Sequence, residues 1–158
     1  MLNSAQLRVL IIKPVLLDLS LYSEDAIELL IFTCANESDG GSYLKQVDGP
    51  ALGIYQMEPA TYNDIWQNFI YKRMDLKLKL IHHFNAATMP PEDRLVYDLA
   101  FATAMSRIFY LRIDEPIPKS NDTTAIYNYY KKYYNTAAGA ANYQQAVEKY
   151  LQFINAKS

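Results

Sequence analysis

The sequence contains very little cysteine and histidine, and this limits the chemistry that it can perform. Its 158 residues include one cysteine, Cys34, and two histidines. A single thiol cannot form an internal disulfide, so the fold needs no oxidising compartment. His82 and His83 are adjacent, and with Cys34 they give neither a metal-ligand spacing nor a catalytic triad, so we interpret them as structural. We therefore expect no metal site, no cofactor and no thiol nucleophile.

The sequence also lacks an excess of positive charge and a long apolar run. Lys and Arg number 15 against 17 Asp and Glu, which favours neither nucleic-acid binding nor strong attraction to an anionic cell wall. No run of about 18 apolar residues occurs, so we predict no membrane span. Lys13 and Pro14 interrupt the apolar stretch 9–17, and no small-residue cleavage site follows it. We expect synthesis in the cytoplasm without a signal peptide.

The hydrophobic pattern that is present predicts a mainly α-helical fold in a single domain, residues 1–158. Helical spacing of apolar residues extends over 7–17 with a bend or end near Pro14, 23–37, 59–73, 76–81, 88–112, 122–134 and 142–154. The stretch 43–55 does not follow this spacing, and Val47-Asp48-Gly49-Pro50 predicts a turn between two short extended pieces. A small β-hairpin-like segment is therefore expected there.

The helix predicted over 23–37 ends on a glutamate, Glu37. Ser23 can cap its start, and Ala26, Leu30, Thr33 and Glu37 recur at spacings of three and four, so Glu37 continues the apolar stripe. An apolar surround and the carbonyl end of a helix both raise the pKa of a carboxyl group. A glutamate that stays protonated near neutral pH can donate a proton to a glycosidic oxygen. The alternative is a surface glutamate at a fraying helix end.

A Gly-rich turn follows Glu37-Ser38, and then comes Gly53-Ile54-Tyr55-Gln56-Met57-Glu58-Pro59-Ala60-Thr61. This order resembles lytic transglycosylases and goose-type lysozymes, in which a Glu-Ser pair closes a core helix and a Gly-x-x-Gln-(Met/Ile)-x-Pro-x-Thr segment lines the glycan cleft. The resemblance implies a lysozyme-like helical domain with Glu37 as general acid and base. It also implies substrate-contacting roles for Ser38, Tyr55, Gln56 and Met57, although Ser38 could instead orient Glu37 and Tyr55 could simply pack.

Tyrosines are dense between Tyr127 and Tyr134, where core packing explains most of them. Tyr134-Asn135 followed by Gly139 resembles the Tyr-Asn-x-Gly element of lytic transglycosylases, in which the tyrosine reaches toward the catalytic glutamate. Here three residues, rather than one, separate the asparagine from the glycine. Tyr134 and Asn135 are nevertheless predicted as substrate-binding residues.

The resemblance implies a muramidase that cleaves the β-1,4 bond between N-acetylmuramic acid and N-acetylglucosamine in a peptidoglycan strand. An inverting hydrolase needs a second carboxylate, for which Asp39, Asp48 and Glu58 are candidates. Asp39 and Asp48 lie in turns, where acidic residues are common, and Glu58 can cap the helix that starts at Pro59. We therefore favour a lytic transglycosylase over a hydrolytic lysozyme, with a mechanism assisted by the substrate's own N-acetyl group as the alternative.

The segment 49–61 also resembles compact lysozyme-like proteins of tailed bacteriophages. This resemblance implies a virion-associated protein, or one released to the cell wall, with other virion tail proteins as possible partners. The alternative function is a structural component of the virion tail that keeps the lysozyme-like fold with little or no activity. A helical adaptor with coincidental motifs is a third interpretation.

Overall fold

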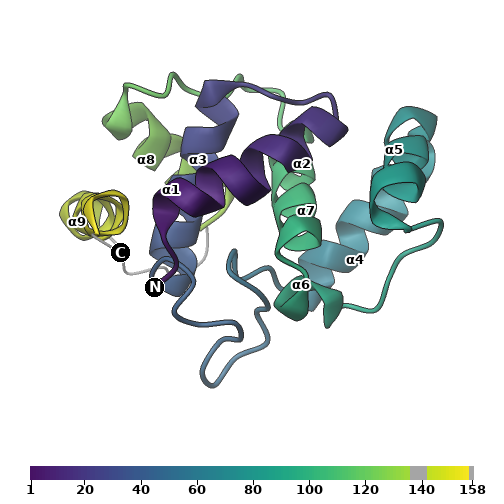
Figure 1. The fold of residues 1–158 in the computed structure, drawn as a ribbon, viewed down its shortest axis with the longest axis horizontal. Coiled ribbons are helices and arrows are strands. Elements are labelled where there is room, and N and C mark those ends of the chain that lie inside the picture. The colour runs from purple at the N-terminus through teal and green to yellow at the C-terminus, as the bar shows by residue number, and fades with distance from the viewer. Residues whose placement is uncertain (136–141, 157–158) are drawn as a thin grey trace.

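The computed structural model describes residues 1–135 and 142–156, and helices make up the regular structure of this part of the chain. They are α1 (Ser4–Gln6), the π-helical segment η1 (Leu7–Ile12), α2 (Lys13–Asp18), α3 (Glu24–Ser38), α4 (Pro59–Asn68), the 3-10 segment η2 (Ile70–Lys72), α5 (Met74–Phe84), α6 (Arg94–Tyr97), α7 (Leu99–Leu111), α8 (Thr123–Tyr133) and α9 (Tyr143–Asn155). The prediction of an α-helical fold is confirmed. In Figure 1, α3 and α7 lie in the middle, with α4 and α5 on one side and α8 and α9 on the other.

Helix α3 forms the centre of the fold. Ser23 Oγ accepts a hydrogen bond of 3.0 Å from the Ala26 amide, which caps the first turn as predicted. Asp39 ends the helix in the left-handed conformation, at φ 49°. Buried side chains occur on all sides of α3, which packs against α7, α8 and α9, as expected of a helix surrounded by core. Glu37 thus lies on the last turn of a deeply buried helix.

The N-terminal helix continues through Pro14 because its backbone widens just before that residue. The Lys13 amide donates to the Arg8 carbonyl group, five residues back, in the π-helical segment. A wider turn shifts the residues that face the core. Ile12 is therefore fully buried, whereas Leu10, which helical spacing places on the inner face, is 63% exposed.

The expected β-hairpin around residues 43–55 is wrong. In the described part of the chain this segment contains only isolated antiparallel bridges, Lys45 to Leu52 and Leu52 to Met57. Residues with positive φ interrupt the extended path every few positions, namely Asp48 at 58°, Gly53 at 77° and Gln56 at 48°. A ladder needs consecutive extended pairs, so the segment 42–58 folds as a loop, exposed over 42–48 and buried over 51–55. Figure 1 shows this loop below α3.

Two predicted helices are divided. The helix expected to reach Arg112 from the Pro90-Pro91 pair is split into α6 and α7 at Asp98, whose Oδ1 accepts a 2.9 Å hydrogen bond from the Phe101 amide. An aspartate that caps a new helix ends the preceding one. The helix from Pro59 ends at Asn68 rather than Arg73, because Phe69 has φ −130°.

A hydrophobic cluster contains buried side chains from α2 through α9. Its largest fully buried members are aromatic, with Trp66, Tyr62 and Phe101 among them. Within residues 1–135 and 142–156, no helix has the length and apolar character needed to cross a membrane. The fold therefore fixes the end of α3 and the second half of the loop, residues 52–57, against one continuous core.

Candidate functional site

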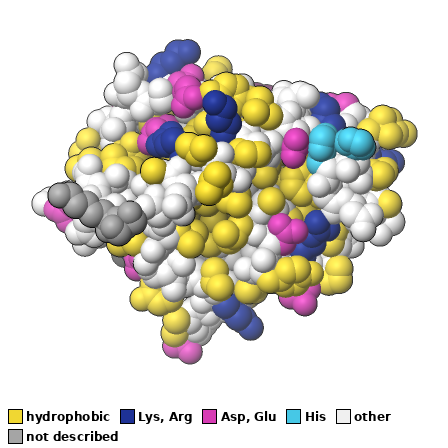
Figure 2. Space-filling model, viewed as in Figure 1, with side chains coloured by type: hydrophobic (Ala, Val, Ile, Leu, Met, Phe, Trp, Pro, Cys, Tyr) yellow, Lys and Arg dark blue, Asp and Glu magenta, His cyan; other side chains and the backbone are white. Residues whose placement is uncertain are grey.

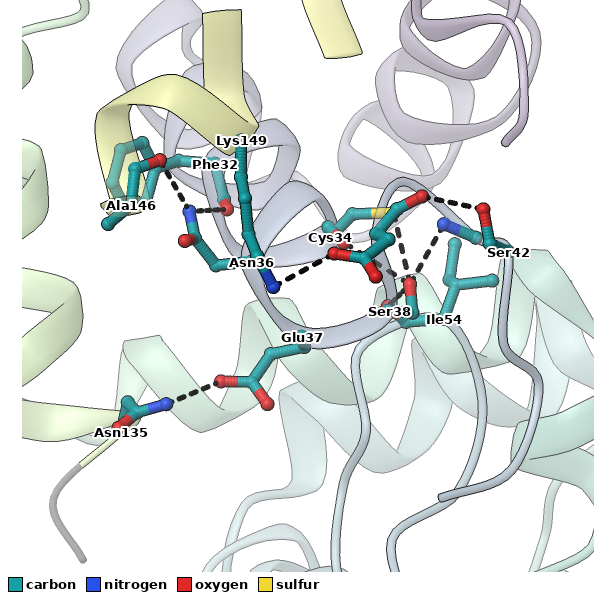
Figure 3. Close-up of polar contacts among 12 residues, drawn as sticks. Phe32, Cys34, Asn36, Glu37, Ser38, Ser42, Ile54, Asn135, Ala146 and Lys149 are labelled. Atoms are coloured by element: carbon teal, nitrogen blue, oxygen red, sulfur yellow. Dashed lines mark hydrogen bonds and ion pairs between the residues drawn. The ribbon is translucent and has the colours of Figure 1, made fainter. Parts of the chain in front are cut away.

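Glu37 lies at the end of α3, where side chains from the end of α8 hold its carboxylate. Tyr130 donates a hydrogen bond from its hydroxyl group to Glu37 Oε1 at 2.5 Å, and Asn135 Nδ2 donates to the same oxygen at 3.3 Å. Asn135 Nδ2 also donates to the Tyr130 hydroxyl group at 3.0 Å. Figure 3 shows the Glu37 side chain directed toward Asn135. The carboxylate therefore has one bonded oxygen in a fixed position.

The environment of Glu37 raises the pKa of its carboxyl group. Burial is the main cause, because it disfavours the charged form. The hydrogen bonds from Tyr130 and Asn135 oppose this effect, as do the positive charges of Lys149 and Lys131, since all four favour the carboxylate. The pKa of Glu37 is therefore raised, as the sequence predicts, because the effect of burial exceeds the opposite effects of these four side chains.

A cavity of about 390 Å³ opens beside Glu37. It is lined by Glu37, Gln46, Ala51, Gln56, Met57, Glu58, Thr61, Phe109, Tyr134 and Asn135. Five of the seven predicted site residues are in this lining. The loop 42–58, the first turn of α4, α7 and the end of α8 therefore meet at the end of α3.

Gln56 and Met57 reach the cavity because the loop turns sharply just before them. Gly53 has φ 77°, and a Cβ atom at this position would overlap the carbonyl oxygen of Leu95. Gln56 itself has a positive φ, and its Nε2 donates to the Gly53 carbonyl group at 2.8 Å. The glycine thus lets the loop pack directly on the backbone of α6.

Ser38 and Tyr55 are outside the described cavity lining. Ser38 is fully buried, and its Oγ donates to the Ile54 carbonyl group at 2.6 Å and accepts from the Gly41 amide at 2.9 Å. Figure 3 shows Ser38 and Glu37 pointing in different directions from the end of α3. The structure therefore places Ser38 as the link between α3 and the loop, rather than as a residue that orients Glu37.

Tyr55 packs rather than facing the cavity, which was the second of its two predicted roles. It is 1% exposed, and its hydroxyl group lies 2.9 Å from Thr103 Oγ1 of α7. Its carbonyl group accepts a 2.7 Å hydrogen bond from the Tyr134 hydroxyl group. Tyr134 therefore holds the loop in position while it lines the cavity and stacks on Tyr110.

The tyrosine that bonds to Glu37 is Tyr130, which the sequence reasoning missed. Tyr130 and Tyr134 are four residues apart and face the same side of α8, so both approach the end of α3. The four-residue spacing was the feature of the sequence that could have identified Tyr130 as a site residue. The tyrosine of the Tyr-Asn element thus fixes the loop, and the tyrosine one turn earlier contacts the glutamate.

Four residues of the cavity lining, Gln46, Ala51, Thr61 and Phe109, were also missed as site residues. Phe109 comes from α7, which the apolar pattern predicts only as a packing helix, and Thr61 is the last residue of the Gly53–Thr61 segment. The glycine of the Tyr-Asn element, Gly139, lies outside the described residues, as does the segment 136–138. The described part of that element is therefore Tyr134 and Asn135, and both line the cavity.

Of the three candidate second carboxylates, Glu58 is the one in the described cavity lining. It stands at the N-cap position of α4, but its side chain makes no capping hydrogen bond to this described helix, so the predicted capping role is not observed. Asp39 forms an ion pair of 2.9 Å with Lys149, and Asp48 lies in the loop at a positive φ. Glu58 is therefore the candidate that shares the described cavity lining with Glu37.

Cys34, His82 and His83 are not among the described residues that line the Glu37 cavity. Cys34 is fully buried, and burial raises the pKa of its thiol to about 12. His82 and His83 are exposed on α5, and His83 Nδ1 lies 3.5 Å from Asp18 Oδ1. No group of three or more His, Cys, Asp or Glu residues within 1–135 and 142–156 is arranged to hold a metal ion.

Comparison of the chain with protein-family models, with curated proteins and with solved structures yields no match. The function is therefore argued from the residues around Glu37 and from the local sequence resemblance.

Proposed function

We propose that this chain is a lysozyme-like muramidase that cleaves the β-1,4 bond between N-acetylmuramic acid and N-acetylglucosamine in peptidoglycan, with the lytic transglycosylase outcome favoured. The observation that carries the proposal is the position of Glu37. Its carboxyl group has a raised pKa, is held by Tyr130 and Asn135, and lines an open cavity. A general acid needs these properties together.

The rest of the cavity lining suits a sugar strand. Gln46, Gln56 and Asn135 supply amide groups, which can donate to and accept from sugar hydroxyl and N-acetyl groups. Met57 and Phe109 supply apolar surface for the face of a pyranose ring. Among the described residues of this lining there is no lysine or arginine, so contacts to hydroxyl and amide groups of a sugar are favoured over contacts to an anionic group.

Glu37 acts twice in the proposed reaction. As an acid, it gives its proton to the glycosidic oxygen, and the bond from that oxygen to C1 of the muramic acid breaks. As a base, the resulting carboxylate takes the proton of the 6-hydroxyl group while that oxygen bonds to C1. The product carries a 1,6-anhydro end, and Glu37 is protonated again. Tyr130 and Asn135 keep the same carboxylate oxygen in place through both steps.

The proposal is tested on purified peptidoglycan, with the released muropeptides analysed by mass. We expect 1,6-anhydro ends from the natural chain and a loss of release by at least about a hundredfold in Glu37→Gln, which removes the transferable proton. The matched control is Asp48→Asn, which removes a carboxylate outside the described cavity lining and keeps a residue that tolerates positive φ. No release from the natural chain, or full release from Glu37→Gln, overturns the proposal.

Glu58 decides between the two outcomes of the same reaction. If a water molecule attacks C1 with inversion, a second carboxylate activates it, and Glu58 lines the same cavity as Glu37. For a transglycosylase we expect Glu58→Gln to leave the anhydro ends as the main product. A product with reducing ends that disappears in Glu58→Gln identifies a hydrolytic lysozyme instead.

A structural role in a virion tail is the second candidate function, and one feature favours it. Val9, Leu10 and Leu17 are 58%, 63% and 55% exposed along the N-terminal helix. Figure 2 shows hydrophobic side chains gathered over this helix. Exposed apolar patches are common at protein–protein contacts. Copurification with virions, together with no muropeptide release, would support this function over the enzymatic one.

A further inference from the structure

A second cavity, of about 490 Å³, lies between the end of α5 and helix α6. The described residues that line it are all different from those that line the Glu37 cavity. In Figure 1 the connection between α5 and α6 runs on the side of α7 away from α8 and α9. A cavity of this size falls within the usual range of small-molecule sites, roughly 300–1,000 Å³.

The second cavity presents an aromatic ring to solvent. Tyr97, the last residue of α6, is 72% exposed, which is unusual for a side chain with so large an apolar face. Asn85 and Thr88 belong to the same lining and add an amide and a hydroxyl group. Asn85 has φ 50° where it caps the end of α5, so the backbone fixes its place. An exposed ring next to uncharged hydrogen-bonding groups is the chemistry that binds a sugar ring.

Arg94 lines this cavity, and its side chain is held in place by three contacts, one of which is an ion pair. Its Nε lies 3.0 Å from Asp98 Oδ2, and its Nη2 donates to the Phe84 carbonyl group at 2.6 Å. Its guanidinium group also lies over the ring of Phe101, 4.4 Å from the ring centre. Because Asp98 matches the charge of Arg94, an anionic ligand gains little here. An uncharged ligand fits the cavity better.

The first turn of α4 lies between the two cavities. Glu58 and Thr61 line the Glu37 cavity, whereas Tyr62 donates from its hydroxyl group to the Pro90 carbonyl group at 2.6 Å, in the wall of the second cavity. Neighbouring residues of this turn therefore contact the walls of both cavities.

We propose that the cavity between α5 and α6 is a second saccharide site, in which an uncharged pyranose ring stacks on Tyr97 and hydrogen-bonds to Asn85 and Thr88. The choice of an N-acetylated sugar, from the strand that Glu37 cleaves, rests on the proposed function. Binding of a pyranose ring at the second cavity does not rest on it.

The test is a titration of the full ¹⁵N-labelled chain, carrying Glu37→Gln to prevent cleavage, with the N-acetylglucosamine tetramer. We expect amide shifts in two groups, one around Gln56 and one over residues 85–97. Tyr97→Ala should abolish the second group, or weaken its apparent binding constant about tenfold, since a stacking ring is lost. Tyr97→Phe should stay within about twofold because it keeps the ring. The matched control variant is Tyr143→Ala, because Tyr143 is an exposed tyrosine on α9. Maltotetraose is the control ligand, because it lacks N-acetyl groups.

The outcomes separate the two proposals. Shifts around Gln56 without shifts over 85–97 overturn the second site and leave the proposed function standing. Shifts over 85–97 alone support the second site and count against the Glu37 cavity as a glycan site. Shifts over 85–97 that persist in Tyr97→Ala overturn the stacking arrangement. The absence of any shift also overturns the second site, and the muropeptide assay then judges the function independently.

Discussion

Tyr130 controls the proton of Glu37, since its hydroxyl group donates to the carboxylate. A donated hydrogen bond favours the charged form, so it lowers the Glu37 pKa that burial raises. Tyr130→Phe keeps the ring in its edge contact with Phe32 and removes the hydroxyl group, which donates to Glu37 and accepts from Asn135 Nδ2. We therefore expect the Glu37 pKa to rise further, and the high-pH limb of the activity profile to move to higher pH.

This prediction is checked by pH–rate profiles and by titration of Glu37 with carbon NMR. Tyr129→Phe is the control, because the Tyr129 hydroxyl group donates to the Glu115 carbonyl group, not to Glu37. Lys131 and Lys149 also act on Glu37 and stay in place in both variants. A limb that moves to lower pH, or does not move, would contradict the assigned role of Tyr130.

Ser38 has a mechanical role at the same helix end, and its removal should cost stability. Ser38→Ala leaves the Ile54 carbonyl group and the Gly41 amide without their buried partner. We expect a loss of roughly 1–3 kcal/mol in the free energy of unfolding, measured with denaturant. Ser42→Ala is the control, because Ser42 is exposed on the loop. An unchanged stability in Ser38→Ala would show that the link between α3 and the loop is dispensable.

At the scale of elements, the contact between the loop 42–58 and α6 depends on Gly53. In Gly53→Ala the new methyl group would overlap the Leu95 carbonyl oxygen, at a residue that already has positive φ. The backbone must move, so we expect a loss of about 3 kcal/mol or more in the free energy of unfolding. We also expect muropeptide release to fall, because Gln56 and Met57 follow on the same loop.

Gly49→Ala tests whether that loss is specific. The atoms nearest to its new methyl group belong to the end of the Gln46 side chain, which can rotate away at the cost of its hydrogen bond from the Ala51 amide. We expect a loss of less than about 1 kcal/mol here by the same denaturant measurement. Equal losses in the two variants would mean that α6 does not fix the loop.

The helix starts at Ser23, Asp122 and Asn142 were predictable, because the capping residue and the first turn are neighbours in sequence. The split at Asp98 was not, since an apolar pattern continues across it and one side-chain hydrogen bond decides the break. The loop 42–58 was wrongly predicted for a related reason. Its path is set by residues with positive φ, of which only the glycine could be anticipated.

The candidate site also has a part that the sequence predicts and a part that it does not. Glu37 and the residues Gln56 and Met57 come together because a short sequence motif encodes both the helix end and the loop. Tyr130 comes from a distant helix, and the packing of α8 on α3 brings it there. Sequence spacing shows that Tyr130 and Tyr134 share a face but does not show which hydroxyl group reaches Glu37.

At the scale of the whole molecule, the net charge predicts how the proposed cleavage of cell walls depends on salt concentration. The formal net charge is −2, so long-range attraction to an anionic cell wall is weak. We expect cleavage of intact cell walls to change less than about threefold between about 0.05 and 0.5 M salt. The uncharged N-acetylglucosamine tetramer is the control ligand for the same salt series. A steep fall of wall cleavage with salt, without a matching effect on the tetramer, would reveal a basic surface that directs binding.

The buried position of Cys34 makes it a reporter on the centre of the fold. It is the only cysteine in the chain and is fully buried on α3, three residues before Glu37. A thiol reagent can therefore modify it only when α3 separates from its neighbours. The labelling rate under native conditions then measures how often the helix that carries Glu37 opens, and a ligand that binds beside Glu37 should slow it.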